Sequence, residues 1–219
     1  MVRHRLRVTF AKALQLRYIS HLDLQLAWER ALRRARIPLA YSQGYNPQAK
    51  LQLASGLPLG YCGAAEILDV ILTEPMSQEE FTTRVGPALP EGLTIGEVRE
   101  VPLKSRSLQS ALHQAEYRVI VETSLSADEL TRRLEKLLAT DRLDQQRVRK
   151  GRSETFDLRP LVDKVQLESI EEGQAIFWMR LSAGQRGNAR PDAVLTALDL
   201  ANAYSQVERI RLLFEFDIR

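Results

Sequence analysis

The sequence predicts an α+β fold of the tandem ferredoxin-like type, in which a βαββαβ order occurs twice. The first observation is that the hydrophobic periodicity of residues 1–101 predicts a strand, a helix, two strands, a helix and a strand, in that order. The second is that this order returns over residues 115–219, after a polar connection at 102–114. We therefore expect two domains, 1–101 and 115–219, joined by that linker. Each would hold an antiparallel sheet with its helices on one face.

The first domain begins with a strand and a capped helix. Residues 3–10, RHRLRVTF, alternate polar and apolar side chains, which indicates a strand with one buried face. Ser20 and Asp23 have the spacing of a shortened capping box, and the helix that they open ends before Pro38. The other expected elements are extended pieces at 39–41 and 50–53, strands at 67–72 and 93–101, and a helix from Ser77 to Gly86.

The second domain shows the same kinds of signal. Ser126 and Glu129 form a capping box for a helix that runs to about residue 139. Pro191 suits the first turn of another helix, which we expect to reach about residue 204. The remaining elements are strands at 117–121, 175–181 and 207–216, with extended chain at 145–150 and 157–167.

Charge is unevenly distributed along the 219 residues. Residues 1–50 hold ten Lys and Arg against two Asp and Glu, a net charge of +8. The other 169 residues carry 21 basic and 26 acidic groups, a net charge of −5. This asymmetry favours an anionic partner, and the alternative is a solvated helix face that acidic groups elsewhere balance in three dimensions.

The composition also excludes several classes of protein. No apolar run approaches the roughly 18 residues of a membrane span, and MVRHRLRVTF lacks the apolar core of a signal peptide. We therefore expect a cytoplasmic protein. The single cysteine, Cys62, cannot form an internal disulfide or ligate a structural zinc or an iron–sulfur cluster. Because no HExxH or CxxC motif occurs either, we expect no metal and no cofactor in this chain.

The stretch from Arg17 to Lys50 combines cations, tyrosine rings and a turn rich in hydrogen-bonding groups. Such mixtures are typical of sites that hold unpaired bases and phosphates, and the alternative is a structural turn whose tyrosines pack on the sheet. In a βαββ arrangement the two ends of the stretch can approach each other and form one site. The candidate ligand- or RNA-binding residues are Arg17, Tyr18, Ser20, His21, Asp23, Ser42, Gln43, Gly44, Tyr45, Asn46 and Lys50.

His21 is the one candidate for catalysis. It would lie in the first turn of the helix, where the helix dipole disfavours the charged imidazolium. A neutral imidazole beside arginines is suited to act as a general base on a ribose hydroxyl. The alternative is a histidine that forms only local hydrogen bonds.

A second basic run lies in the second half of the chain. Alternation over 145–150 would place two arginines of this run on one face of a strand. The alternative to a binding surface is a strand edge that charge protects from pairing with other strands. The residues of this second candidate patch are Arg147, Arg149, Lys150, Asp157 and Arg159.

Two blocks of the sequence resemble a known family. RYISHLD, RALRRA and YSQGYNP follow one another within residues 17–47, and RKG followed by FDLRPLV stands at 149–162. In order and spacing they resemble the radical SAM-linked, or radical SAM-associated, bacterial proteins, an uncharacterised family with a domain of unknown function. The resemblance implies a radical SAM protein as partner, which would carry an iron–sulfur cluster and S-adenosylmethionine. It assigns no catalytic residue to this chain.

A more distant likeness concerns architecture. Tandem ferredoxin-like units with a histidine on an early helix are similar to the RAMP-type ribonucleases that process CRISPR RNA, and His21 would fall near the position of their general base. Those enzymes carry a glycine-rich loop late in the second unit. Here the approach to the last strand reads ANAYSQVERI, which speaks against nuclease activity.

Three functional hypotheses follow. The first is a non-catalytic RNA-binding or substrate-recognition adaptor that works with a radical SAM enzyme in RNA or ribosome modification. The second is a protein-interaction domain that docks the radical SAM partner without RNA. The third is a metal-independent endoribonuclease that uses His21. The sequence does not separate the first from the second, because phosphates and carboxylates attract the same arginines.

Overall fold

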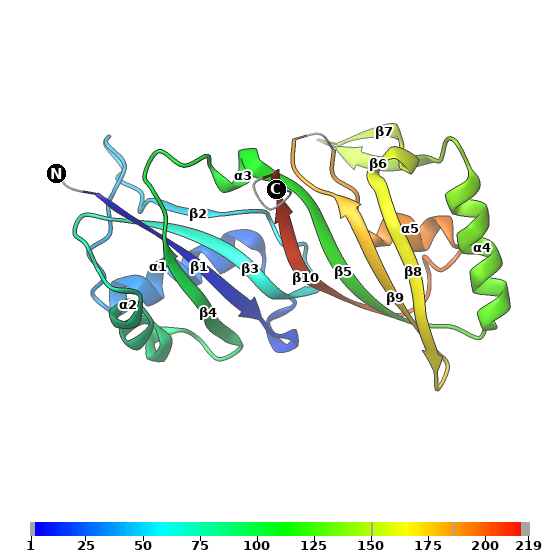
Figure 1. Ribbon diagram of the computed structural model, residues 1–219, viewed down its shortest axis with the longest axis horizontal. Helices are drawn as coiled ribbons and strands as arrows, with labels where there is room; N and C mark the ends of the chain where they lie inside the picture. Colours follow the sequence, from blue (N-terminus) through cyan, green and yellow to red (C-terminus); the bar gives the residue numbers. More distant parts are fainter. Residues whose placement is uncertain (1–2, 150, 186, 216–219) are drawn as a thin grey trace. The chain divides into compact units, whose positions relative to one another are not determined.

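The computed structural model describes residues 3–149, 151–185 and 187–215 of the chain, and its fold is α+β with antiparallel strands (Figure 1). The chain divides into two units. The first comprises Met1–Leu112 with Phe214–Arg219, and the second comprises His113–Leu213. None of the helices in the described ranges is long and apolar enough to cross a membrane.

The first unit follows the order strand, helix, strand, strand, helix, strand. Its sheet has the strand order β4-β1-β3, and β2 pairs with β3. All of these pairs are antiparallel. The elements are β1 (His4–Lys12), η1 (Leu14–Leu16), α1 (His21–Arg34), β2 (Leu51–Leu53), β3 (Tyr61–Leu72), α2 (Gln78–Val85), η2 (Gly86–Ala88), β4 (Leu93–Glu100) and α3 (Leu108–Ala111).

Both α1 and α2 cover one face of this sheet, because apolar residues of the two helices and of one sheet face form a single core. Alternation in β1 points Leu6, Val8 and Phe10 into that core. Trp28 of α1 is fully buried, and its ring meets Phe10 edge to face at 5.0 Å between centroids. The predicted helix start is confirmed, since Ser20 and Asp23 form a reciprocal capping box.

The second unit has a comparable order of elements. Its strands are arranged β10-β5-β9-β8, while β6 and β7 form a separate hairpin. Helix α4 packs beside β8, and Arg133 of α4 donates to the Leu198 carbonyl at the end of α5, at 2.8 Å. The elements are β5 (Leu112–Glu122), α4 (Ala127–Ala139), β6 (Asp144–Arg149), β7 (Arg152–Asp157), η3 (Arg159–Leu161), β8 (Val162–Glu171), β9 (Gln174–Ser182), α5 (Pro191–Ala197) and β10 (Ser205–Phe214).

Several predicted boundaries are wrong, including those of β5 and β8. The strand expected at 67–72 begins at Tyr61, because the chain before Ile67 also pairs with β1, with Glu66 opposite Phe10 and Gly63 opposite Lys12. The helix expected to reach residue 204 ends at Ala197. Asp199 adopts the left-handed conformation there, with φ of 58°, and the Leu200 N–H donates to the Leu195 carbonyl at 2.8 Å, which stops the helix.

The stretch 102–114 is also more structured than its polar composition predicts. Residues Leu108–Ala111 form α3, whose N-terminus is capped by the Ser107 hydroxyl accepting from the Ser110 N–H at 3.2 Å. Strand β5 then starts directly at Leu112. Local alternation missed this because a four-residue helix is shorter than the window that reveals helical periodicity.

Replacement of Ser126 by Ala should lower the free energy of unfolding by about 1 kcal/mol, because the Ser126 hydroxyl accepts from the Glu129 N–H at the start of α4. Urea unfolding followed by circular dichroism measures the change. Ser124→Ala, at an exposed position just before the cap, is the matched control and should change stability by less than about 0.5 kcal/mol. Equal effects of the two substitutions would contradict the capping role.

Glu116 of β5 should make the second unit sensitive to acid. Burial alone would raise the pKa of Glu116, but hydrogen bonds from Arg211 and Arg180, at 2.6 and 2.8 Å, hold that pKa below its usual value. The carboxylate therefore stabilises the fold above its unfolded pKa, and the stabilisation is lost as pH falls through the lower folded pKa. Chemical unfolding of wild type and Glu116→Gln should differ at neutral pH and converge in acid. A constant difference across pH would exclude this linkage.

Candidate functional site

Two arginines and one aspartate form a buried charged cluster in the first unit. Arg5 and Arg7 of β1 are 5% and 4% exposed, and Asp69 of β3 is 2% exposed. The Asp69 carboxylate accepts from Arg7 Nε at 2.8 Å and from Arg5 Nε at 3.1 Å. Two arginines share one carboxylate, so the cluster of these three residues keeps one net positive charge below the surface of the sheet.

The cluster lies on the sheet face opposite α1 and α2. In the strand register, Gln52 faces Asp69, Asp69 faces Arg7, and Arg7 faces Arg99. The neighbouring residues along the strands, such as Val8 beside Arg7 and Leu68 beside Asp69, belong to the core shared with the helices. Because side chains alternate along a strand, these four residues lie on the other face. We call this line the polar row: Gln52, Asp69, Arg7 and Arg99. It crosses all four strands of the first unit's sheet.

The segment after β4 folds over part of this face. Arg5 donates to the Ser105 carbonyl at 2.9 Å and to the Arg106 carbonyl at 3.4 Å. Two pockets open on either side of Ser105, which lines both. The prediction of one buried face for the first strand is thus wrong, because the covering segment buries the second face as well.

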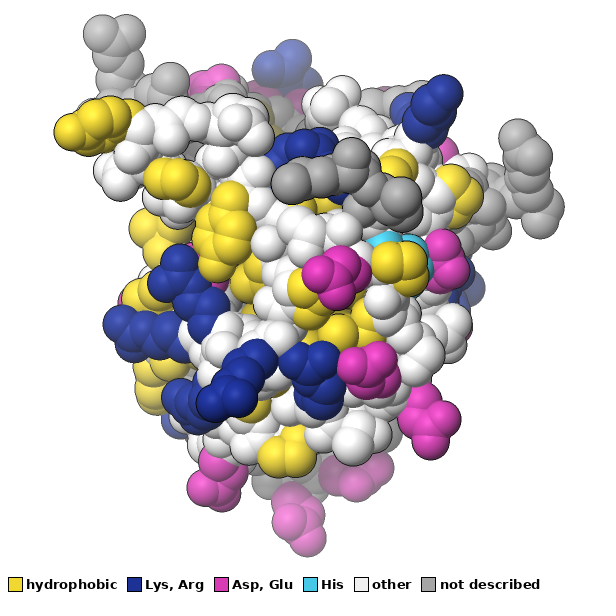
Figure 2. Space-filling model, turned by 90° about the vertical axis from the view of Figure 1, so that its left-hand side faces the viewer, with side chains coloured by type: hydrophobic (Ala, Val, Ile, Leu, Met, Phe, Trp, Pro, Cys, Tyr) yellow, Lys and Arg dark blue, Asp and Glu magenta, His cyan; other side chains and the backbone are white. Residues whose placement is uncertain are grey.

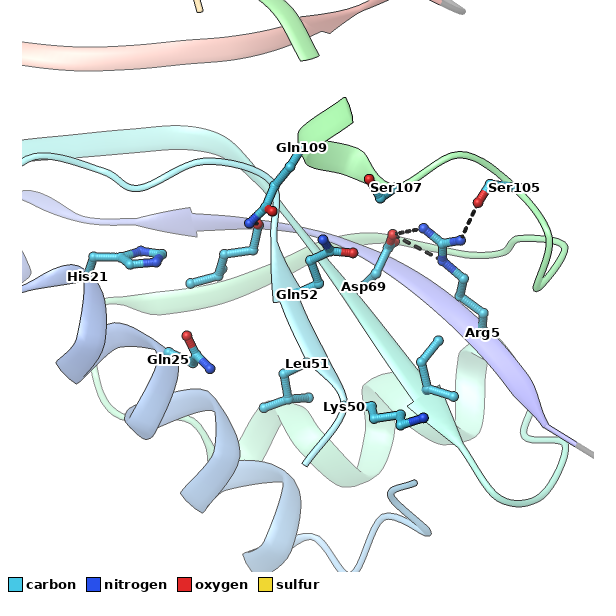
Figure 3. A pocket seen from close by; sticks show the side chains of 12 residues that line it. Arg5, His21, Gln25, Lys50, Leu51, Gln52, Asp69, Ser105, Ser107 and Gln109 are labelled. Carbon is cyan, nitrogen blue, oxygen red and sulfur yellow. Dashed lines mark hydrogen bonds and ion pairs between the residues drawn. The ribbon is translucent and has the colours of Figure 1, made fainter. Parts of the chain in front are cut away.

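The larger pocket has a volume of about 510 Å³ and draws its lining from several elements. Figure 3 shows His21 and Gln25 on α1, Gln52 on β2, Asp69 on β3, and Gln109 on α3 around one space. The remaining lining residues are Arg5, Lys50, Leu51, Leu53, Ile71, Ser105 and Ser107. Two of the sequence-predicted residues, His21 and Lys50, therefore line the same pocket, although they are 29 positions apart in the sequence.

The position of His21 is set by the cap and by a buried lysine. Lys12 is 1% exposed, and its ammonium donates to the Tyr61 carbonyl at 3.1 Å and the Ile19 carbonyl at 3.4 Å. This holds the segment before α1 against the start of β3. The imidazole then packs over Gly56, where an added Cβ would lie 3.7 Å from the ring. Its Nδ1 is buried without a hydrogen-bond partner among the described residues.

Other candidates around the helix start have structural contacts. The Ser20 hydroxyl donates to the Asp23 carboxylate at 2.7 Å and accepts from the Asp23 N–H, so both side chains serve the cap. The Arg17 guanidinium lies 4.6 Å from the Tyr18 ring centroid, a cation–π contact at the surface. Tyr18 itself is 67% exposed. These four residues do not line the pocket that contains His21.

The SQGYNP loop is closed by its own hydrogen bonds. The Ser42 N–H donates to the Gln48 carbonyl at 2.8 Å, and the Ser42 hydroxyl accepts from the Gln48 N–H at 2.9 Å. Gly44 has a φ of 133°, which favours glycine at that turn position. Gln43, Tyr45 and Asn46 are exposed. The loop presents these side chains to solvent, and only Lys50 beyond it reaches the pocket.

The second candidate patch lies in the second unit. Arg147 and Arg149 belong to β6, two positions apart, and Lys150 lies outside the described residues. Asp157 accepts from the Leu143 N–H at 2.8 Å and from the Arg159 N–H at 3.0 Å. The Leu143 bond, with help from Arg159, lowers the pKa of Asp157. Arg159 in turn donates to the Leu138 carbonyl at the end of α4, so this pair connects backbone segments.

Basic groups are also exposed on α1, and some already have protein partners. Lys and Arg side chains gather at the lower left of the face shown in Figure 2, with Asp and Glu mainly elsewhere. Arg33 pairs with Glu29 at 3.2 Å and donates to the Tyr41 hydroxyl at 3.3 Å. Arg34 donates to the Ala88 carbonyl at 3.4 Å. The helix arginines therefore serve packing as well as surface charge.

No group of three or more His, Cys, Asp or Glu that could hold a metal ion occurs in the described ranges. The pocket offers amides, one imidazole and cations, which suit hydrogen bonding to an organic ligand or an anion. This donor set contains one carboxylate, and both arginines of the cluster already bind it.

Sequence reasoning missed most of the pocket, including Gln25, Gln52 and Gln109. One signal was present: Asp69 is the acid inside the apolar run ILDVIL. A charge at such a position implies a buried partner, and the basic residues of the first strand were the available ones. The glutamines had no such signal, because single amides occur throughout any surface.

The chain belongs to a family described as an uncharacterized protein conserved in bacteria (DUF2344), whose model matches residues 5–191. No curated protein matches the sequence. Among solved structures, a chain of a Cbf5–Nop10–Gar1 complex is similar with a TM-score of 0.52 at 12% identity, covering 94% of this chain and 48% of that one. A chain of an archaeal box H/ACA Nop10–Cbf5 complex has a TM-score of 0.49 at 9% identity, with 94% and 47% covered. This chain thus spans about half of either, and the first likeness describes the fold alone.

Replacement of Asp69 by Asn should destabilise the first unit by about 3–5 kcal/mol, because it removes the buried carboxylate that two buried guanidinium groups share. Chemical denaturation monitored by tryptophan fluorescence, in a Trp178→Phe background so that Trp28 reports, measures the loss. Glu97→Gln removes an exposed carboxylate from β4 and serves as the control, with an expected change below about 0.5 kcal/mol. If Asp69→Asn were equally mild, the cluster would not hold the sheet face together.

Proposed function

We propose that this chain is a non-catalytic RNA-binding or substrate-recognition module that works with a radical SAM enzyme in RNA or ribosome modification. The observation that carries the proposal is the combination of the polar row with a pocket of hydrogen-bonding side chains beside it. Cations attract phosphates without regard to sequence, and uncharged polar groups distinguish bases. The first unit presents both kinds of group on one sheet.

The smaller pocket supplies the phosphate-attracting part. It has a volume of about 430 Å³ and is lined by Arg7, Arg99, Glu100 and Arg106. Arg7 binds Asp69 and Arg106 pairs with Glu215 at 2.7 Å, so Arg99 is the main phosphate-attracting candidate of this lining. Arg99 is exposed, so its guanidinium is accessible to a ligand. Guanidinium groups form paired hydrogen bonds with phosphate oxygens, which favours an anionic backbone as the ligand of this surface.

The radical SAM partner is inferred from the family motifs at 17–47 and 149–162. In this proposal the partner carries the iron–sulfur cluster and S-adenosylmethionine, and the present chain contributes recognition. One cysteine is too few for a cluster of its own.

We further propose that the two units are tandem ferredoxin-like repeats. They would correspond to the domains that the sequence predicts at about 1–101 and 115–219. Two features support this. Each unit has the element order βαββαβ apart from the added β6–β7 hairpin and α3, and in each the fourth strand of that order neighbours the first.

A protein-interaction domain without RNA is the second candidate, and an exposed apolar stripe favours it. Leu22 and Leu26 lie four positions apart on α1 and are 73% and 41% exposed, and Tyr18, in the turn before the helix, is 67% exposed. Exposed apolar side chains at helical spacing are a common feature of docking faces. Arg17 and Arg30 border the stripe, so an acidic partner surface would suit it.

The double variant Lys50→Ala with Arg99→Ala should bind single-stranded RNA more weakly and with less dependence on salt. Two lost phosphate contacts would reduce the slope of log K against log salt by about 1.4. Filter binding across a salt series measures both quantities, and Lys136→Ala, an exposed lysine of α4, is the control. Salt-independent binding, or an unchanged double variant, would count against RNA recognition. Co-purification of a radical SAM protein without RNA would then favour the docking alternative.

A further inference from the structure

Three glutamine side chains converge on the larger pocket from three different elements. Gln25 comes from α1, Gln52 from β2 and Gln109 from α3 (Figure 3). Each primary amide offers two donors and one acceptor at a planar head group. A cluster of neutral amides around one space is suited to a ligand that itself has a donor and acceptor edge.

Two of these amides lack partners within the protein. Gln25 and Gln52 are half-buried. Neither side-chain amide forms a hydrogen bond within the described part of the chain. The Gln109 side-chain N–H donates to the Leu53 carbonyl at 3.5 Å, which orients the Gln109 amide. The amide oxygen of Gln109 can then accept from a ligand. The amides of Gln25 and Gln52 can therefore form hydrogen bonds with a ligand without giving up a protein partner.

The rest of the lining adds an imidazole ring and apolar surface to the pocket. The imidazole of His21 extends into the space from its end near the start of α1 (Figure 3). Leu51, Leu53 and Ile71 add apolar surface. A volume of about 510 Å³ lies within the usual range for small organic ligands, about 300–1,000 Å³.

The distribution of charged side chains favours a ligand with a neutral part inside the pocket and an anionic group at the pocket's edge. Of the cluster, Arg5 and Asp69 line this pocket and form an ion pair, so the two together add no net charge to the wall near the amides. Lys50 adds a cation to the lining, and the arginines of the smaller pocket lie beyond Ser105. A nucleotide has this distribution, with an uncharged base and a charged phosphate.

We infer that the larger pocket holds one unpaired nucleobase of an RNA strand, read by Gln25, Gln52 and Gln109, with Lys50 beside its phosphate. The inference rests on the proposed RNA-binding function and names the group that the same surface recognises. Side-chain amides form paired hydrogen bonds with base edges, and His21 offers a ring against which a base can stack.

Fluorescence anisotropy with labelled oligonucleotides of equal length tests this. The probes are homopolymers of A, C and U and an abasic strand with the same number of phosphates. Wild type should bind at least one homopolymer about tenfold more tightly than the abasic strand, as expected for one good amide–base pair. Gln25→Leu with Gln52→Leu should bring that ratio close to one while leaving the salt dependence unchanged. Gln78→Leu with Gln166→Leu, at exposed positions, should keep the preference.

The outcomes separate the pocket from the wider function. If wild type binds all strands equally, including the abasic one, RNA binding stands and the base pocket is wrong. If wild type binds none of them, both are wrong. Should the glutamine variant fail to fold, nuclear magnetic resonance of wild type gives an independent result. Nucleoside 5′-monophosphates should then shift the side-chain amide signals of Gln25 and Gln52, and unshifted signals overturn the inference.

Discussion

The sharing of Asp69 between Arg5 and Arg7 is the interaction on which the first unit depends. Buried charges are stable only when they are paired and hydrogen-bonded, and this carboxylate accepts from both guanidinium groups. The arrangement joins β1 to β3 on the face that the helices do not cover. Because Arg5 also donates to the Ser105 carbonyl, the same cluster holds the segment after β4 against the sheet. Both pockets exist because that segment is held there.

The site therefore consists of a rigid part and an exposed part. Cross-strand register positions the polar row, while the capping box and Lys12 position His21 at the start of α1. The SQGYNP loop and Tyr18 project from the surface and have few contacts with the sheet. A ligand bound in the larger pocket would meet side chains that strands and helices already orient, which lowers the entropy that binding must offset.

Much of the fold could be predicted from local patterns. Alternation identified β1 and β10, and the spacing of Ser20 and Asp23 identified the start of α1. The errors occurred where conformation depends on contacts remote in sequence or on a single residue. Pairing with β1 extends β3 back beyond Ile67, and Asp199 ends α5 early by adopting the left-handed conformation. In the candidate site, His21 and Lys50 were predicted together, whereas Gln52 and Gln109 were not.

The sequence by itself determined the α+β class, the starts of the four longer helices, the basic N-terminal fifth of the chain and membership of an uncharacterised bacterial family. These properties depend on spacing, composition and motif order, which can be read along the chain. Tertiary structure decided which basic groups are buried, which amides share a pocket and which face of the sheet the segment after β4 covers. Those outcomes depend on strand register and on hydrogen bonds between residues as much as 100 positions apart, such as the one from Arg5 to Ser105.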